Sequence, residues 1–92
     1  MELNQDYGKS LRRLEGEALK SELLSIVKYI ATVGQPTSDR GCYLILENVS
    51  RLPSFDEQSH VVAGMLEAVP NYSRGVHSKL ESWRTAQDEE LA

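Results

Sequence analysis

The chain has 92 residues, of which 40% are hydrophobic and 26% are charged, and it carries a net charge of −4 and a single Cys. This length predicts one domain over residues 1–92, and the apolar content excludes a disordered chain because it suffices for a core. One Cys excludes an internal disulfide and favours a reducing compartment, and no apolar stretch reaches the roughly 20 residues of a membrane span. We therefore expect a cytoplasmic protein without a membrane partner.

The negative charge is concentrated in the second half of the chain. Positive and negative side chains cancel over residues 1–28 and again over 29–55, whereas seven acids face three basic residues over 56–92. Residues 52–73 contain no Lys or Arg. Such a surface repels nucleic acid and attracts a basic partner. The alternative is an acidic surface that only keeps the protein soluble.

The first predicted helical region has two parts. Residues 17–33 carry one apolar stripe at helical spacing, and Gly34 marks its end. Upstream, Leu11 and Leu14 begin a second stripe that lies about 115° away. Either Gly16 breaks the helix, or one long helix contacts two neighbours. We expect a short helix that leans on a longer one.

A second helix is predicted between the N-cap residues 37–39 and Pro53. Its residues 42–46 form a short continuous apolar run, which would also suit a strand. The helical spacing continues to Val49 and Leu52, and this favours a helix.

The third helix has a clear beginning. Ser54 and Glu57 form a capping box, in which the hydroxyl and the carboxylate each bond the other residue's backbone amide. Apolar residues such as Val61 and Met65 then form its buried face, and Pro70 ends it.

A fourth helix is predicted to open near residues 71–73 and to carry an apolar stripe as far as Trp83, followed by a frayed acidic tail over residues 88–92. A Leu-Glu-x-Val pattern recurs at 46–49 and 66–69, as in helices that stack in pairs. The sequence therefore predicts an all-α fold, a compact four- or five-helix domain built from antiparallel helical hairpins.

Residue types with catalytic chemistry are poorly placed for it. Cys42 falls on the apolar face of the second helix, which predicts a buried small side chain rather than a nucleophile. His60 and His77 lie on different helices without the spacing of a metal motif, and no glycines form a phosphate loop. We predict no catalytic residue, metal or cofactor, and hence no enzyme.

Acidic and aromatic side chains supply a candidate contact surface. The solvent face of the third helix would suit a basic protein, and tyrosines outside the apolar stripes are typical of interface centres. The predicted partner-binding residues are Asp56, Glu57, His60, Glu67, Tyr43 and Tyr29. The alternative for each tyrosine is a partly buried position at the edge of the domain.

Residues 75–84 resemble the final helix of the small bacterial immunity proteins that neutralise nuclease colicins and pyocins. The shared features are Gly75, the aliphatic Val76 and, about two turns later, the pair Trp83 and Arg84. The chain departs from that family before this helix, where the family has a short helix with a Tyr-Tyr-Pro element. The resemblance implies toxin immunity as a type of function, through electrostatic and aromatic contacts with a basic nuclease.

Together these patterns predict a stoichiometric protein-binding protein, an inhibitor or immunity protein that neutralises a basic effector such as a bacterial toxin. One alternative is a structural or adaptor helical module, with a homo-oligomer as one form of it. A helix-turn-helix nucleic-acid regulator is a further alternative. It is disfavoured because the third helix offers no Lys or Arg to phosphates.

Overall fold

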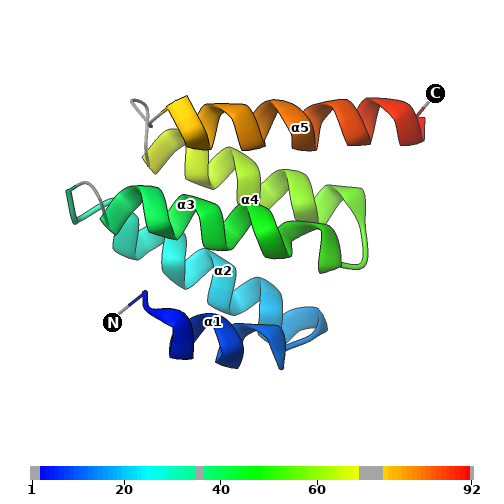
Figure 1. Cartoon of the computed structure of the whole chain (residues 1–92). Coiled ribbons are helices and arrows are strands. Elements are labelled where there is room, and N and C mark those ends of the chain that lie inside the picture. The colour runs from blue at the N-terminus through cyan, green and yellow to red at the C-terminus, as the bar shows by residue number, and fades with distance from the viewer. Residues whose placement is uncertain (1–2, 35–36, 69–73, 92) are drawn as a thin grey trace.

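The computed structural model describes residues 3–34, 37–68 and 74–91, and these residues form helices and no strand (Figure 1). The elements are α1 (Gln5–Arg12), α2 (Gly16–Ile30), α3 (Thr37–Asn48), the 3-10 turn η1 (Val49–Arg51), α4 (Phe55–Ala68) and α5 (Arg74–Leu91). The predicted all-α class is confirmed. None of these described helices combines the length and apolar character needed to cross a bilayer.

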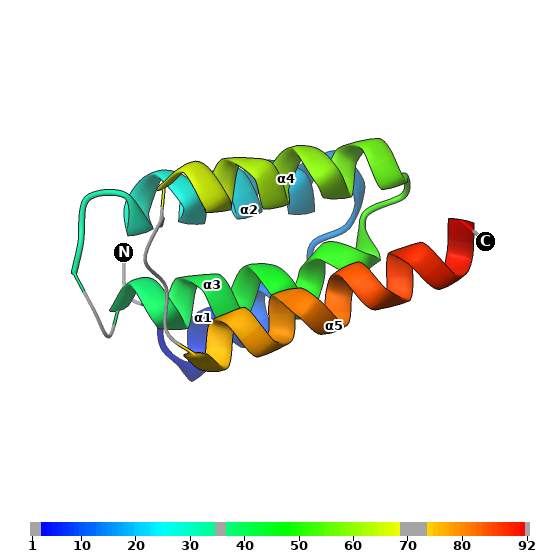
Figure 2. The same ribbon diagram turned by 90° about the horizontal axis from the view of Figure 1, so that it is seen from above.

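The helices alternate between two layers (Figure 2). Helices α1, α3 and α5 form one layer, and α2 and α4 form the other, with consecutive helices running in opposite directions. Helix α2 packs against both α3 and α4, and α5 packs against α3. The chain is therefore a series of antiparallel hairpins, and each helix has an inner face toward the other layer and an outer face toward solvent.

Gly16 separates α1 from α2, as expected. Its φ of 57° lies in the left-handed region that favours glycine. The Tyr7 hydroxyl joins the two helices by donating to a Glu22 carboxylate oxygen at 2.5 Å. Burial and this hydrogen bond raise the pKa of Tyr7 above its usual range. The short helix α1 therefore leans on the longer α2.

The core lies between the two layers. The segment 42–46 is helical, so the strand alternative is excluded. The apolar face predicted for the second helix is buried from Cys42 to Leu52, but α3 ends at Asn48 and the rest of this face belongs to η1 and Leu52. The most deeply buried large side chains of the described residues are Leu11, Leu19, Leu23, Ile26, Ile30, Ile45, Met65 and Leu80. These side chains come from all five helices, so the described residues share one core.

Side chains from α3 and η1 bond the carbonyl groups at the ends of α1 and α2. The buried Ser38 hydroxyl donates to the carbonyl of Val33 at 2.9 Å and lies 3.3 Å from that of Ile30. The Arg51 guanidinium reaches three carbonyl groups at and beyond the end of α1. Both contacts satisfy backbone acceptors that a helix end leaves without partners.

Two helix ends differ from the prediction. Helix α2 ends at Ile30 rather than near Gly34. The backbone N–H and the hydroxyl of Thr32 both donate to the Tyr29 carbonyl, at 3.0 and 2.8 Å, so the α-helical i to i−4 pattern gives way to a tighter i to i−3 turn. Helix α5 continues to Leu91, where the frayed tail 88–92 was expected. The segment after Trp83 has no Gly or Pro and is rich in strong helix formers, so it stays helical after the apolar stripe stops.

Candidate functional site

The outer face of α4 carries most of the predicted acidic and histidine side chains. Asp56, His60, Ala63 and Glu67 follow one another at intervals of three or four residues, so they form one row along the helix. All four are exposed. The buried Met65 lies about 180° around the helix from Asp56, so the row points away from the core.

The charges in this row have no counter-charge on their own helix. Residues 52–73 contain no Lys or Arg, and within the part of the chain that the structure describes neither Asp56 nor Glu67 forms an ion pair. Surface carboxylates without a local cation extend their field into solvent over about 8–10 Å at ordinary ionic strength. The row can therefore act on a charged partner before contact.

Glu57 has a different position from the other acids of α4. Its backbone N–H donates to the Ser54 hydroxyl at 3.2 Å, which is the first of the two predicted capping-box bonds. The side chain is half-buried, and its Oε2 atom is buried without a hydrogen-bond partner in the described structure. A carboxylate in the first turn of a helix stabilises the helix N-terminus. Glu57 therefore stabilises α4 rather than adding to its exposed outer face.

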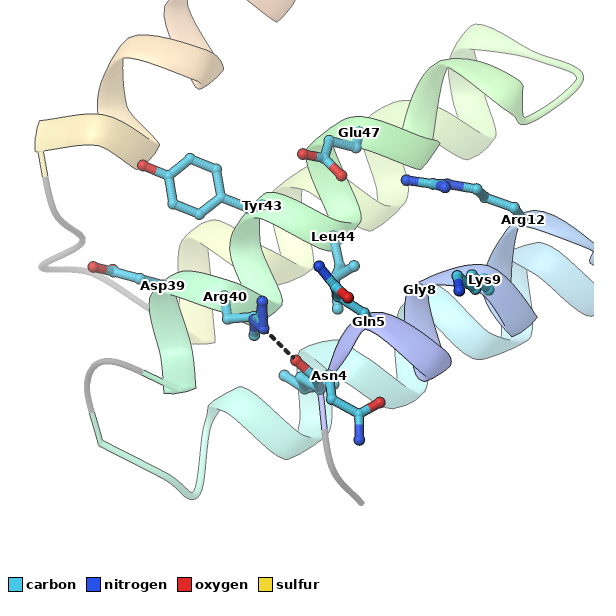
Figure 3. Close-up of a pocket in the computed structure, with 11 residues that line it drawn as sticks. Asn4, Gln5, Gly8, Lys9, Arg12, Asp39, Arg40, Tyr43, Leu44 and Glu47 are labelled. Carbon is cyan, nitrogen blue, oxygen red and sulfur yellow. Dashed lines mark hydrogen bonds between the residues drawn. The ribbon is translucent and has the colours of Figure 1, made fainter.

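Tyr43 lies on the outer face of α3, in the other layer. The Lys79 ammonium of α5 sits 5.5 Å from the centre of the Tyr43 ring and 3.5 Å from a Glu47 carboxylate oxygen. The positive charge of the ammonium group is attracted to the negative electrostatic potential over the face of the aromatic ring. Tyr43 is half-buried and is one of the residues that line a groove between α1 and α3 (Figure 3).

Tyr29 is also apart from the acidic row. It is half-buried on α2 and packs against the core. It lies about 160° around α2 from Val27, the residue that meets Gly64 of α4. The structure thus groups Asp56, His60 and Glu67 but separates both tyrosines from them. Tyr43 belongs to the other layer, and Tyr29 lies in the same layer as α4 but on a side of α2 that is turned away from the α4 contact.

The groove between α1 and α3 was not predicted from the sequence. It has a volume of about 630 Å³ and is lined by Lys9 and Arg12 of α1 and by Arg40 and Leu44 of α3, among others (Figure 3). The two helices that form it are separated by all of α2, so only tertiary packing brings these side chains together. The single sequence signal was the pair of basic residues on one side of the short helix α1.

The residues with potential catalytic chemistry are placed as follows. Cys42 is completely buried on the inner face of α3, and burial together with the nearby Asp39 carboxylate raises the pKa of its thiol to about 11. His60 is exposed on α4 and His77 is exposed on α5, in the other layer. Within the described ranges, no three His, Cys, Asp or Glu side chains are grouped to hold a metal ion.

Cys42 is expected to resist thiol reagents in the folded protein. At about pH 8, the raised pKa alone lowers the thiolate fraction about 100-fold relative to an ordinary Cys, and burial blocks access as well. Since the folded state holds the proton more tightly, this contribution to stability is present below the ordinary pKa of 9.0 and is lost as the pH rises toward about 11. The measurement is the rate of reaction with a disulfide reagent, native against urea-unfolded; equal rates would contradict the burial of Cys42.

No protein-family model matches the chain, and no curated protein or solved structure matches it either. Its function is therefore inferred from the two outer faces of the fold.

Proposed function

We propose that this chain is a stoichiometric protein-binding protein, not an enzyme, and that it binds a basic partner through the outer face of α4. The observation that carries the proposal is the exposed row of Asp56, His60, Ala63 and Glu67 on a helix without Lys or Arg. Electrostatic complementarity of this kind steers a partner toward the surface and raises the association rate. Ala63 in the middle of the row leaves room for a long Lys or Arg side chain of the partner.

Within this class, we propose an inhibitor that neutralises a basic effector such as a bacterial toxin, acting in the cytoplasm without a cofactor. Support comes from the small size, the net charge of −4 and the resemblance of residues 75–84 to the last helix of nuclease-toxin immunity proteins. In that segment Val76 is buried and Trp83 is half-buried. Both residues therefore serve the core, and the contact with the effector is assigned to α4.

The test compares two variants with the same change in net charge. Asp56→Lys with Glu67→Lys removes the acidic row, whereas Asp6→Lys with Glu81→Lys changes two exposed acids on the other layer. Asp6 is matched to Asp56, because each lies in the first turn of its helix. We expect capture of the basic partner from a cell lysate, quantified by mass spectrometry, to fall at least about tenfold for the first variant and to stay within about twofold for the second.

Equal capture by the two variants would show that the row on α4 is not the contact surface. A captured partner that is acidic rather than basic would contradict the proposal in the same way, because like charges on both surfaces disfavour association.

A second candidate is an adaptor or structural module. The alternation of hairpins between two layers favours it, since stacked helical hairpins present extended faces on which partners bind. Light scattering over a range of concentrations distinguishes one form of it, a homodimer, from the proposed inhibitor. A stable mass of two chains in the absence of any partner would favour the module.

A further inference from the structure

The groove between α1 and α3, called here the α1–α3 groove, is a basic feature of an acidic protein. Its wall on α1 carries Lys9 and Arg12, and its wall on α3 carries Arg40 (Figure 3). These cations face two acids of α3, Asp39 and Glu47, and the Glu47 carboxylate is already paired with Lys79 of α5. The groove therefore has an excess of positive charge in a chain whose net charge is −4.

The floor of the groove is apolar. The backbone at Gly8 of α1 lies close to α3, and a Cβ atom there would be 3.7 Å from Cδ2 of Leu44. Leu3 is buried and Leu44 is half-buried beneath the polar walls. The Arg40 guanidinium donates to the Leu3 carbonyl at 3.1 Å, and this bond holds the cation beside the floor. An apolar floor with a few fixed polar groups is typical of a binding site.

The volume of the groove suits a short chain segment. A volume of about 630 Å³ is in the usual range for ligand sites, and α1 and α3, which form the groove, belong to the same layer. An extended peptide presents side chains alternately to the floor and to the walls. Carboxylates on such a peptide can accept paired hydrogen bonds from the guanidinium groups of Arg12 and Arg40.

We propose that the α1–α3 groove binds an extended segment of a partner protein that carries at least two carboxylates. A nucleic acid is the less suitable occupant, because its continuous row of phosphates would pass Asp39 and Glu47 on the α3 wall. The groove lies between α1 and α3, which belong to the layer opposite to that of α4. The protein can therefore hold an acidic segment on one face and a basic partner on the other.

The groove is tested with two charge-neutralising variants. Lys9→Gln with Arg12→Gln removes the cations of α1, and Lys28→Gln with Arg84→Gln removes one Lys and one Arg elsewhere. All four side chains are exposed, and Lys28 lies in the last turn of its helix as Lys9 and Arg12 do in theirs. Circular dichroism melting curves establish that both variants fold.

Random peptides of about nine residues, displayed on phage, are selected on the unmodified protein, and selected sequences are synthesised with a fluorophore for anisotropy measurements. We expect enrichment in Asp and Glu, and at least about tenfold weaker binding to the groove variant than to the matched variant. The variant Asp56→Lys with Glu67→Lys should bind the peptide as tightly as the unmodified protein does. This result would show that the groove is a separate site from the acidic row of α4 on which the proposed function rests. In the unmodified protein, bound peptide should shift the amide NMR signals of Gly8 and Leu44 and leave those of α4 in place.

Three results would overturn the proposal. The first is a selection without acidic enrichment, and the second is a selected peptide that binds the groove variant as tightly as the matched one. The third is a short single-stranded oligonucleotide that displaces the peptide and binds more tightly with the same dependence on Lys9 and Arg12, which would assign the groove to nucleic acid.

Discussion

Replacing Gly41 by alanine is expected to lower the free energy of unfolding by about 1–3 kcal/mol, although alanine is the better helix former. A Cβ atom at this position would overlap Cγ2 of Ile30 and lie 3.3 Å from Cγ2 of Ile26 and from Cδ1 of Leu3. All three neighbours are buried, so none can move into solvent. Helices α2 and α3 must therefore separate to admit one methyl group, and the core between the layers loses contacts.

Gly64→Ala is the matched control for this prediction. Gly64 lies inside α4, and a Cβ atom there would be 3.6 Å from Cγ1 of Val27, which is an ordinary van der Waals contact. We expect this variant to gain up to about 1 kcal/mol from helix propensity alone. Urea unfolding followed by circular dichroism measures both changes. A gain in stability for Gly41→Ala equal to that of the control would contradict the close packing of α2 on α3.

Replacing Arg51 by alanine is expected to cost about 1–3 kcal/mol of stability, through a contact that joins η1 to the end of α1. Its two terminal nitrogens donate to the carbonyl oxygens of Leu11 at 3.3 Å, Arg12 at 2.8 Å and Leu14 at 2.7 Å, and to Oδ1 of Asn48 at 2.9 Å. The positive charge also lies at the negative end of the α1 dipole. Without Arg51, three carbonyl groups return to water and α1 loses its link to η1.

An arginine that lacks such contacts serves as the control. Among the side chains that the structure describes, Arg84 pairs with Glu81 at 3.6 Å, and both side chains are about half exposed, so Arg84→Ala should change stability by less than about 0.5 kcal/mol. Arg51→Lys should recover only part of the loss, because an ammonium group cannot reach all four acceptors. Thermal melting of the three variants gives the comparison. Similar melting temperatures for Arg51→Ala and Arg84→Ala would disprove the role of Arg51.

The helices could be predicted from the sequence because their signals are local. Gly16 separates α1 from α2 at a position that requires a positive φ. The Ser54 hydroxyl marks the beginning of α4 by accepting a hydrogen bond from the backbone N–H of Glu57, three residues away. The end of α2, which differs from the prediction, depends on other information. At the end of α2, the backbone N–H and the hydroxyl of Thr32 both bond the carbonyl of Tyr29. No periodic pattern reports such a bond.

The candidate site could be predicted only within single helices. Helical spacing placed Asp56 and Glu67 opposite Met65, and the structure shows both acids exposed. The position of Tyr43 relative to these acids depends on which layer each helix joins. That choice is made by contacts between distant residues, such as Gly8 with Leu44, and the same contacts create the α1–α3 groove. The sequence therefore predicted the acidic row but not the groove.

If the acidic row of α4 steers a basic partner, the association rate must depend on salt, and this dependence tests the proposed function most directly. With the captured partner purified, the rate for the unmodified protein should fall at least about tenfold between about 0.02 and 0.3 M salt. Asp56→Lys with Glu67→Lys should associate more slowly and with a flatter dependence on salt, whereas Asp6→Lys with Glu81→Lys should follow the unmodified protein. Identical salt dependence for all three proteins would contradict the proposed function.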